Sequence, residues 1–217
     1  LFITMNTIIT NWKHAWQNSF FRNLLLITLL FFIVLVWVYP LFFDFIEQRQ
    51  GYSMQDPIVN YLQARDNSIF IFSILWLCIA LQIWLIKDKP RQTLLFLLSY
   101  LIINLTRIVT IYFLPLNPPS NLIPLQDPLS NYFYGTTFIT KDLFYSGHTA
   151  IVLLIGFTTQ HKLLKTFFVI AASFIGFMVL SNHVHYTIDV IAAPFFVVLA
   201  IVLSKKIINN RIAIERE

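Results

Sequence analysis

Residues 23–43 read NLLLITLLFFIVLVWVYPLFF and contain no charged side chain. An α-helix needs about 20 mostly apolar residues to cross the hydrocarbon core of a bilayer. Further stretches of this kind follow at residues 67–86, 92–114, 146–164, 166–186 and 188–204. The sequence therefore predicts an all-α, polytopic membrane protein with six transmembrane helices.

The composition of the chain supports a membrane protein. Of the 217 residues, 58% are hydrophobic and 12% are charged, whereas soluble domains carry about 25% charged residues. The length suits one integral membrane domain covering residues 1–217. No short apolar stretch with a small-residue cleavage site is present, so no cleaved signal peptide is predicted. Cys78 is the only cysteine and lies in an apolar stretch, so we expect it to pack in the interior.

Basic residues are divided unevenly between the two sets of segments that connect the spans. The larger set, which includes both termini, holds Lys13, Arg22, Lys87, Lys89, Arg91, Lys162, Lys165, Lys205, Lys206, Arg211 and Arg216, and the smaller set holds Arg49, Arg65 and Lys141. Because cytoplasmic segments carry the excess of Lys and Arg, both termini are predicted to be cytoplasmic. We expect a bacterial inner membrane. The net charge of +5 does not indicate nucleic acid binding, because the basic residues do not form one stripe.

Two segments outside the spans have distinctive compositions, one with regularly spaced aromatic residues and one rich in proline. In residues 1–22, Trp12, Trp16 and Phe20 are spaced by four and would form one aromatic stripe, which predicts an interfacial helix on the cytoplasmic surface. Residues 115–145 are rich in proline. Because proline disfavours helix interiors, we expect an irregular loop over the outer ends of the spans.

The motif HVHYTID at residues 183–189 ends the fifth span and begins the sixth. If His185 and Asp189 share a helix, they lie on one face, one turn apart. A carboxylate bonded to one ring nitrogen fixes the tautomer and leaves the other nitrogen able to attack. The pair is therefore typical of an activated nucleophile, although a buried histidine satisfied by a nearby acid is the structural alternative. His183 would point elsewhere on a helix, so we do not place it in the site.

The motif SGHT at residues 146–149 begins the fourth span. Ser146 is a favoured N-cap, and Gly147 allows close approach of a ligand to the backbone. The first amides of a helix are unpaired and favour phosphate. His148 would lie in the first turn, where it could protonate a leaving oxygen. An ordinary capped helix start is the alternative.

Arg107 lies within the third span, roughly 10 Å from its outer end at 1.5 Å per residue. Its planar guanidinium suits phosphate oxygens, and a structural ion pair with Asp189 or Asp142 is the alternative. Asn104 is a weaker phosphate-binding candidate. Asp142 could orient a histidine, accept a proton from an incoming hydroxyl, or simply be a solvated loop acid.

These residues resemble a known family. The SGHT motif, with Asp142 six residues before His148, resembles the third motif of the sphingomyelin synthase group, and residues 185–190 resemble the fourth. Those proteins belong to the type 2 phosphatidic acid phosphatase superfamily of six-span enzymes. The resemblance covers mainly residues 107–190. It implies His185 as nucleophile, Asp189 as its orienting acid and His148 as proton donor, with a phosphohistidine intermediate, no metal and no cofactor.

The resemblance also has departures. Lys141 precedes Asp142 where the synthases have Cys-Gly-Asp, and Asn182 follows Ser181 where the general phosphatases have an arginine. The basic first motif of those phosphatases is not found. Fewer basic phosphate ligands are therefore visible, which draws attention to Arg107.

We expect a metal-independent membrane enzyme acting on a phospholipid or lipid phosphate at the outer leaflet, with Arg107, Ser146, Gly147 and Asp142 binding the substrate. The alternatives are a lipid head-group transferase of the sphingomyelin synthase type and a non-enzymatic transporter or scaffold. A proton path would need polar residues towards the inner side, and the last two spans are almost purely apolar there. A zinc hydrolase built on His183, His185, Asp189 and His148 is a further possibility. The sequence does not decide the oligomeric state.

Overall fold

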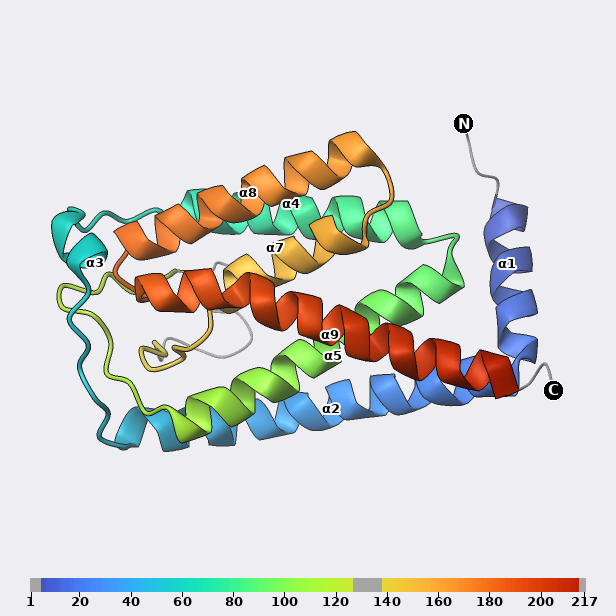
Figure 1. Ribbon diagram of the computed structural model, residues 1–217, viewed down its shortest axis with the longest axis horizontal. Helices are drawn as coiled ribbons and strands as arrows, with labels where there is room; N and C mark the ends of the chain where they lie inside the picture. The colour runs from blue at the N-terminus through green and yellow to red at the C-terminus, as the bar shows by residue number, and fades with distance from the viewer. Residues whose placement is uncertain (1–4, 127–137, 215–217) are drawn as a thin grey trace.

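The computed structural model describes residues 5–126 and 138–214, and Figure 1 shows these residues forming a bundle of helices. The helices are α1 (Met5–Gln17), α2 (Ser19–Gln48), α3 (Pro57–Tyr61), α4 (Ser68–Ile86), α5 (Pro90–Phe113), α7 (Gly147–Thr158), α8 (Lys162–Ser181) and α9 (Thr187–Ile214). Within the described ranges there is no β-strand, so the predicted all-α fold is confirmed.

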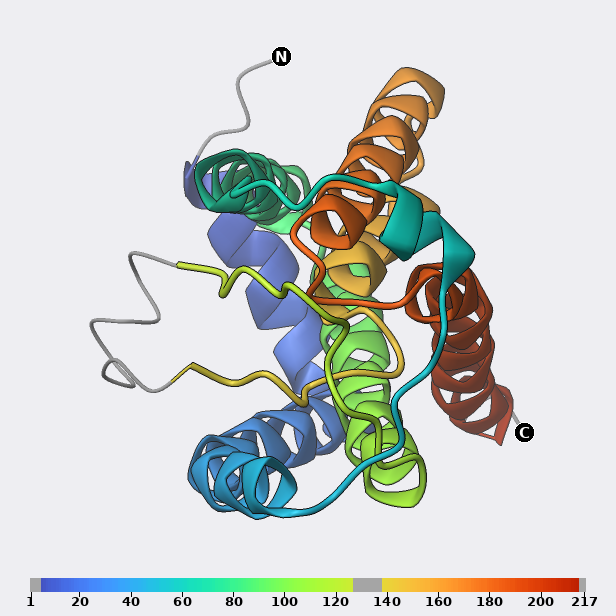
Figure 2. The same ribbon diagram turned by 90° about the vertical axis from the view of Figure 1, so that its left-hand side faces the viewer.

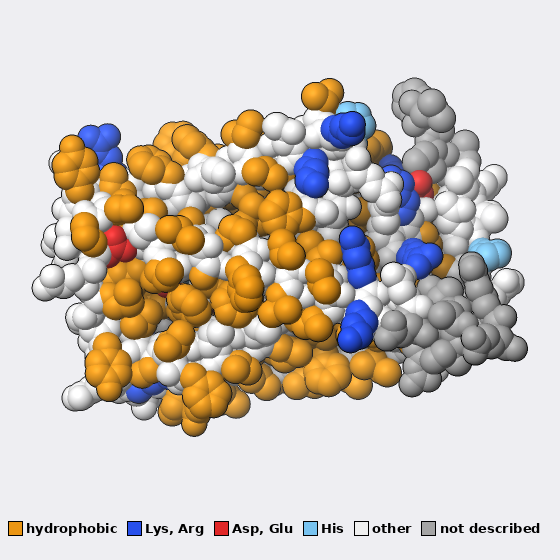
Figure 3. All heavy atoms as spheres, viewed as in Figure 1, with side chains coloured by type: hydrophobic (Ala, Val, Ile, Leu, Met, Phe, Trp, Pro, Cys, Tyr) orange, Lys and Arg blue, Asp and Glu red, His pale blue; other side chains and the backbone are white. Residues whose placement is uncertain are grey.

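Five of these helices, α2, α4, α5, α8 and α9, are long and apolar enough to cross a membrane. Apolar side chains cover the middle of the visible face of the bundle in Figure 3, and many of them are exposed. In water such a surface would be costly, whereas in a bilayer it faces hydrocarbon. The chain is therefore an integral membrane protein.

The fourth predicted span differs from its prediction. Helix α7 has 12 residues, about 18 Å at 1.5 Å per residue, which is shorter than the roughly 30 Å of the hydrocarbon core. The predicted end near residue 164 is wrong, because the helix stops at Thr158. The hydroxyls of Thr158 and Thr159 both donate to the carbonyl of Ile155, at 3.3 and 2.7 Å, where the helix stops. Helix α8 consequently begins at Lys162, earlier than predicted.

Helix α7 lies at the centre of the bundle, in contact with α4, α5, α8 and α9 (Figure 2). Seven of its twelve residues are buried. Gly156 lets α8 approach closely, because a Cβ at this position would meet the Cβ of Phe168 at 3.2 Å. Helix α2, by contrast, packs mainly against α5. The helix that carries His148 is therefore held by four other helices.

Residues 5–22 form parts of two helices rather than one. Asn18 caps α2 by accepting a hydrogen bond from the amide of Phe21 at 2.7 Å, so Phe20 belongs to α2 and the predicted stripe is divided. Helix α1 stands across the end of the bundle in Figure 1. Trp12 fastens it there by donating from Nε1 to the carbonyl of Lys87 at 2.8 Å. An interfacial location for α1 stays a prediction.

The two ends of the bundle differ in charge. Most of the lysine and arginine side chains visible in Figure 3 gather towards the end that carries α1, which we call the α1 end. The opposite end, the α3 end, carries α3 and the described parts of the proline-rich segment, 115–126 and 138–145, which cross it without forming a helix (Figure 2). Pro128 lies outside the described residues. The cytoplasmic position of the α1 end stays a prediction.

Candidate active site

His185 and Asp189 are in direct contact at the α3 end. The Nδ1 atom of His185 lies 3.1 Å from Oδ2 of Asp189, and both side chains are buried. The predicted reason for this contact needs correction, because α9 begins at Thr187 and His185 therefore precedes the helix. Asp189 reaches back from the first turn, where Oδ2 also accepts from the backbone amide of Tyr186 at 3.1 Å. This is the carboxylate half of a capping box.

The contact assigns the two ring nitrogens of His185 different tasks. An Nδ1–H that donates to Asp189 leaves Nε2 as the nitrogen with the lone pair. Nε2 has no hydrogen-bond partner among the described residues. Asp189 is fully buried, and its second oxygen Oδ1 likewise has no partner within residues 5–126 and 138–214. The arrangement can hold an imidazole ready to attack.

The α8–α9 turn, residues 182–186, is the point where the loops of the α3 end meet. His183 has a φ of 58°, and its ring nitrogens lie 2.7 and 3.0 Å from the carbonyl oxygens of Ser120 and Leu62. The hydroxyl of Tyr186 donates to the carbonyl of Asn117 at 2.9 Å. His183 thus points away from His185, as expected, but it does so from a turn and not from a helix. These bonds restrict the movement of His185.

The start of α7 lies against this turn. The backbone amide of Ser146 donates to the backbone carbonyl of Asp189 at 3.1 Å, which joins the two polar motifs directly. Ser146 is the N-cap, and its hydroxyl accepts from the amide of Thr149 at 3.4 Å. Ser146 is fully buried, so the structure gives it a capping position and not a place on the cavity described below. The first amides of the helix belong to Gly147 and His148.

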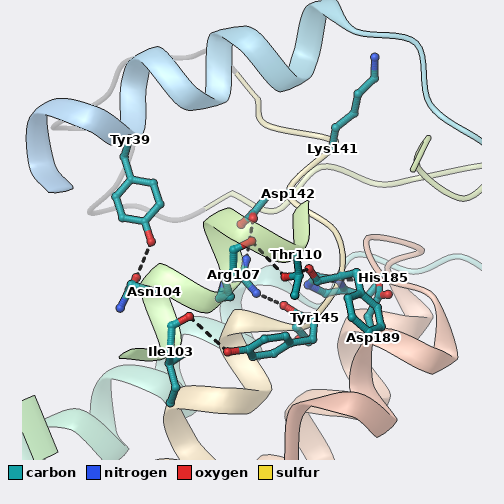
Figure 4. Close-up of polar contacts among 12 residues, drawn as sticks. Tyr39, Ile103, Asn104, Arg107, Thr110, Lys141, Asp142, Tyr145, His185 and Asp189 are labelled. Carbon is teal, nitrogen blue, oxygen red and sulfur yellow. Dashed lines mark hydrogen bonds and ion pairs between the residues drawn. The ribbon is translucent and has the colours of Figure 1, made fainter. Parts of the chain in front are cut away.

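Arg107 projects from α5 towards the start of α7, as Figure 4 shows. Its Nη2 lies 2.5 Å from Oδ1 of Asp142, and its Nη1 donates to the carbonyl of Tyr145. A Cβ on Gly147 would meet the guanidinium carbon of Arg107 at 2.9 Å, so only glycine allows this approach. The ion pair with Asp142 that sequence left open does form, and Arg107 is positioned beside the first amides of α7.

One cavity of about 450 Å³ joins these groups. His148, His185, Arg107, Asp142 and Gly147 all line it. The rest of its wall is mostly apolar and comes from α2, α4, α5 and the loops of the α3 end; it includes Phe43, Phe72, Leu75, Trp76, Ile79, Ile103, Leu122, Leu125 and Val184. The ring of His148 packs edge-on against Phe72, with centroids 5.6 Å apart. The cavity combines a polar end with a hydrocarbon-like wall, as a lipid with a phosphate group requires.

A metal centre does not form from the histidines and acids considered in the sequence. Within the described ranges no three histidine, cysteine, aspartate or glutamate side chains are close enough to hold one ion. His183, one of the four candidate zinc ligands, has both ring nitrogens against carbonyl oxygens of the loops.

Several residues that shape the site were missed in the sequence. Asp56 is one, and it caps two helices at once: Oδ1 accepts from the amides of Ile58 and Val59 at 3.0 and 3.2 Å, and Oδ2 accepts from the amide of Thr187 at 2.6 Å. Burial would raise the pKa of Asp56, but the hydrogen bonds from Thr187 and α3 hold this pKa below its ordinary value. The Asp56-Pro57 pair, a capping residue followed by proline at the first helical position, was the signal that could have revealed it.

Glu47 and Tyr145 were also missed, and they fix the segment that leads into α7. The carboxylate of Glu47, at the end of α2, accepts from the amides of Thr140 and Lys141 at 2.6 and 2.7 Å. Tyr145 is fully buried, and its ring stacks on Phe196 with centroids 4.2 Å apart. The sequence pattern alone carried no signal for either residue.

Comparisons with known proteins give one family match and one similar solved structure. Residues 141–206 match the family described as PAP2 superfamily C-terminal, a match that includes His148, His185 and Asp189 but not Arg107. The match is to the superfamily and does not single out the sphingomyelin synthase group. The crystal structure of Aquifex aeolicus LpxE is similar at a TM-score of 0.49 and 18% identity, over 69% of this chain and 90% of that one. No curated protein matches the sequence.

Proposed function

We propose that this protein is a membrane lipid phosphatase or phosphotransferase that works through a phosphohistidine intermediate. The observation that carries the proposal is that one cavity is lined by His148, His185 and Arg107 and otherwise mostly by apolar side chains. The match of residues 141–206 to the PAP2 superfamily supports it, since PAP2 denotes the type 2 phosphatidic acid phosphatases. The substrate class is a phospholipid or a lipid phosphate.

In the first step Nε2 of His185 attacks phosphorus, and the bond from phosphorus to the lipid oxygen breaks. Asp189 stabilises the charge that develops on the imidazole, and His148 gives its proton to the departing alcohol. In the second step His148 takes a proton from water, the hydroxide oxygen bonds to phosphorus, and the bond from Nε2 breaks. Inorganic phosphate and the dephosphorylated lipid are the products.

Arg107 and the first amides of α7 are the groups we assign to the phosphoryl oxygens. The developing negative charge would lie beside the positive end of the helix dipole and a guanidinium that is nine-tenths buried or more. Asp142 holds this guanidinium in place before the substrate binds. Ser146 supports the same amides as an N-cap, without contacting the substrate.

If a lipid hydroxyl replaces water in the second step, the same residues transfer the phosphorus-bearing head group to another lipid. This is the transferase of the sphingomyelin synthase type. The choice depends on whether water or a second lipid reaches the intermediate.

The test uses purified protein in detergent with EDTA present. A panel of lipid phosphates and of choline- and ethanolamine-bearing phospholipids is offered with and without diacylglycerol or ceramide. We expect release of free phosphate that falls about a thousandfold or more in His185→Ala. The matched control is His161→Ala, because His161 lies at the start of α8, at the other end of the bundle.

The outcomes of this assay distinguish a phosphatase, a transferase and a non-enzymatic protein. A new head-group lipid that forms only when the acceptor is present would identify the transferase. A phosphoryl group on the protein that is labile in acid and absent from His185→Ala would support the intermediate. No turnover by folded parent protein across the whole panel would contradict the proposal and favour a transporter or scaffold.

A further inference from the structure

Tyr39 and Asn104 form a polar pair inside the membrane-spanning part of the bundle. The hydroxyl of Tyr39, on α2, donates to the side-chain oxygen of Asn104, on α5, at 2.5 Å (Figure 4). Both residues also line the cavity. Polar side chains in hydrocarbon are costly and mark function by default. The structural alternative is a hydrogen bond that merely joins two helices.

Among the described residues, the hydrogen bonds of Asn104 leave one of its two side-chain N–H groups without an acceptor. Its oxygen accepts from Tyr39, and its nitrogen donates to the backbone carbonyl of Tyr100 at 2.7 Å. These two bonds fix which way the amide is turned. A side-chain amide has two N–H donors, and among the described residues only one of them has an acceptor. A bond between two helices does not need this second N–H, whereas a ligand oxygen can accept from it.

The position of Asn104 suggests which oxygen that is. Asn104 precedes Arg107 by three residues, so it lies about 4.5 Å farther along α5 from the α3 end. One turn beyond it on α5, Tyr100 also lines the cavity, and apolar side chains of α4, among them Trp76 and Ile79, form part of the same wall. Along α5 the order from the α3 end is therefore the guanidinium that we assign to phosphate, the amide of Asn104, and then an aromatic ring that can lie against an acyl chain. A lipid phosphate presents its parts in the same order, with the acyl carbonyl between the phosphate and the chains.

We propose that Asn104, oriented by Tyr39, binds the carbonyl oxygen of the acyl linkage nearest the phosphate, whether that linkage is an ester or an amide. This inference rests on the proposed function for the identity of the ligand as a lipid phosphate. An acyl carbonyl is a good acceptor, whereas an ether lipid has no carbonyl and leaves the N–H unpaired. Asn104 thus selects acylated lipids over ether lipids.

The test compares lipids that differ only in this group. Diacyl phosphatidic acid and its dialkyl ether analogue of equal chain length are assayed in mixed micelles. Ceramide phosphate is assayed beside them as the lipid whose acyl linkage is an amide. We expect kcat/KM of the parent to favour the diacyl over the dialkyl lipid about fivefold, as one hydrogen bond of about 1 kcal/mol gives. Asn104→Leu should lose this preference by slowing only the acylated lipids. Tyr39→Phe should reduce it, because the amide is no longer held.

Tyr112→Phe is the matched control. Tyr112 lies in the same α2–α5 contact, where its ring stacks on Phe45 with centroids 6.0 Å apart, but it does not line the cavity. The preference should be unchanged in this variant. If Asn104→Leu slows diacyl and dialkyl lipids equally, the pair only joins the helices and the proposal is overturned.

Binding separates this inference from the proposed chemistry. The same two lipids compete with a fluorescent lipid for His185→Ala protein in nanodiscs, with and without Asn104→Leu. Tighter binding of the diacyl lipid that is lost in Asn104→Leu would support the proposed carbonyl-binding role of Asn104, even if no variant turned over any lipid. Equal binding of both lipids by the protein that retains Asn104 would overturn the subsite, whatever the turnover shows.

Discussion

Helices α8 and α2 are both apolar enough to cross a membrane, yet they have different surroundings. Nine of the twenty residues of α8 are buried, against five of thirty in α2. Helix α8 packs in the core that holds α7 and the α8–α9 turn, whereas α2 packs mainly on α5 and forms one wall of the cavity. Hydrophobicity places a helix in the membrane, and only the pattern of its contacts shows whether it supports the residues that we propose to be catalytic.

The largest effect on stability should come from the α8 side of this comparison. Ile175 on α8 is fully buried, whereas Ile33 on α2 is 59% exposed. Ile175→Ala should lower the free energy of unfolding by about 2 kcal/mol, because it leaves a cavity in a packed interior. Ile33→Ala should change it by less than about 0.5 kcal/mol, because lipid replaces the lost contacts. Thermal unfolding in detergent measures both, and equal losses would contradict the comparison.

A smaller effect, on activity alone, is expected at the start of α7. Gly147→Ala would place a Cβ against the guanidinium of Arg107, at 2.9 Å from its central carbon. We expect kcat/KM to fall about tenfold, because displacement of a positioning group by a fraction of an ångström is costly in catalysis. The measurement is lipid phosphate hydrolysis normalised to folded protein.

The matched control for that change is Gly156→Ala, in the same helix but against Phe168 of α8. It should reduce stability and leave the activity of folded protein unchanged. If both variants lose activity alike, the contact between Gly147 and Arg107 is not specific to catalysis.

The smallest effect should come from the loops. The pKa of Asp56 is held below its ordinary value, so its contribution to stability is present above about pH 4 and is lost as pH falls through the lowered pKa. Asp56→Asn should cost about 1 kcal/mol at neutral pH. It should also remove part of the decline in unfolding temperature between pH 6 and pH 3. Asp44→Asn, on the exposed surface of α2, is the control and should leave that decline as it is in the parent.

How well the sequence predicted each region follows from the range of the interactions involved. Spans such as α2 and α4 depend on local hydrophobicity, so their existence was predictable, although α7 is shorter than expected. The contact of His185 with Asp189 was predicted because only four residues separate them, although the shared helix given as the reason was wrong. The bond from Asp56 to Thr187, 131 residues apart in the chain, was not, because nothing local specifies it. Tyr39 was missed for the same reason, since its partner lies 65 residues away.

The shortness of α7 has a consequence for the backbone that leads into it. A helix of about 18 Å that runs from the core of the bundle towards the α1 end begins inside the thickness of the membrane (Figure 1). The segment that leads into it, residues 138–146, must therefore descend below the membrane surface without helical hydrogen bonds. Non-helical backbone at that depth is tolerated only where protein buries it or water fills the space beside it. Leu143, Tyr145 and Ser146 are buried, so the surrounding protein shields the descending backbone from lipid as it approaches His148.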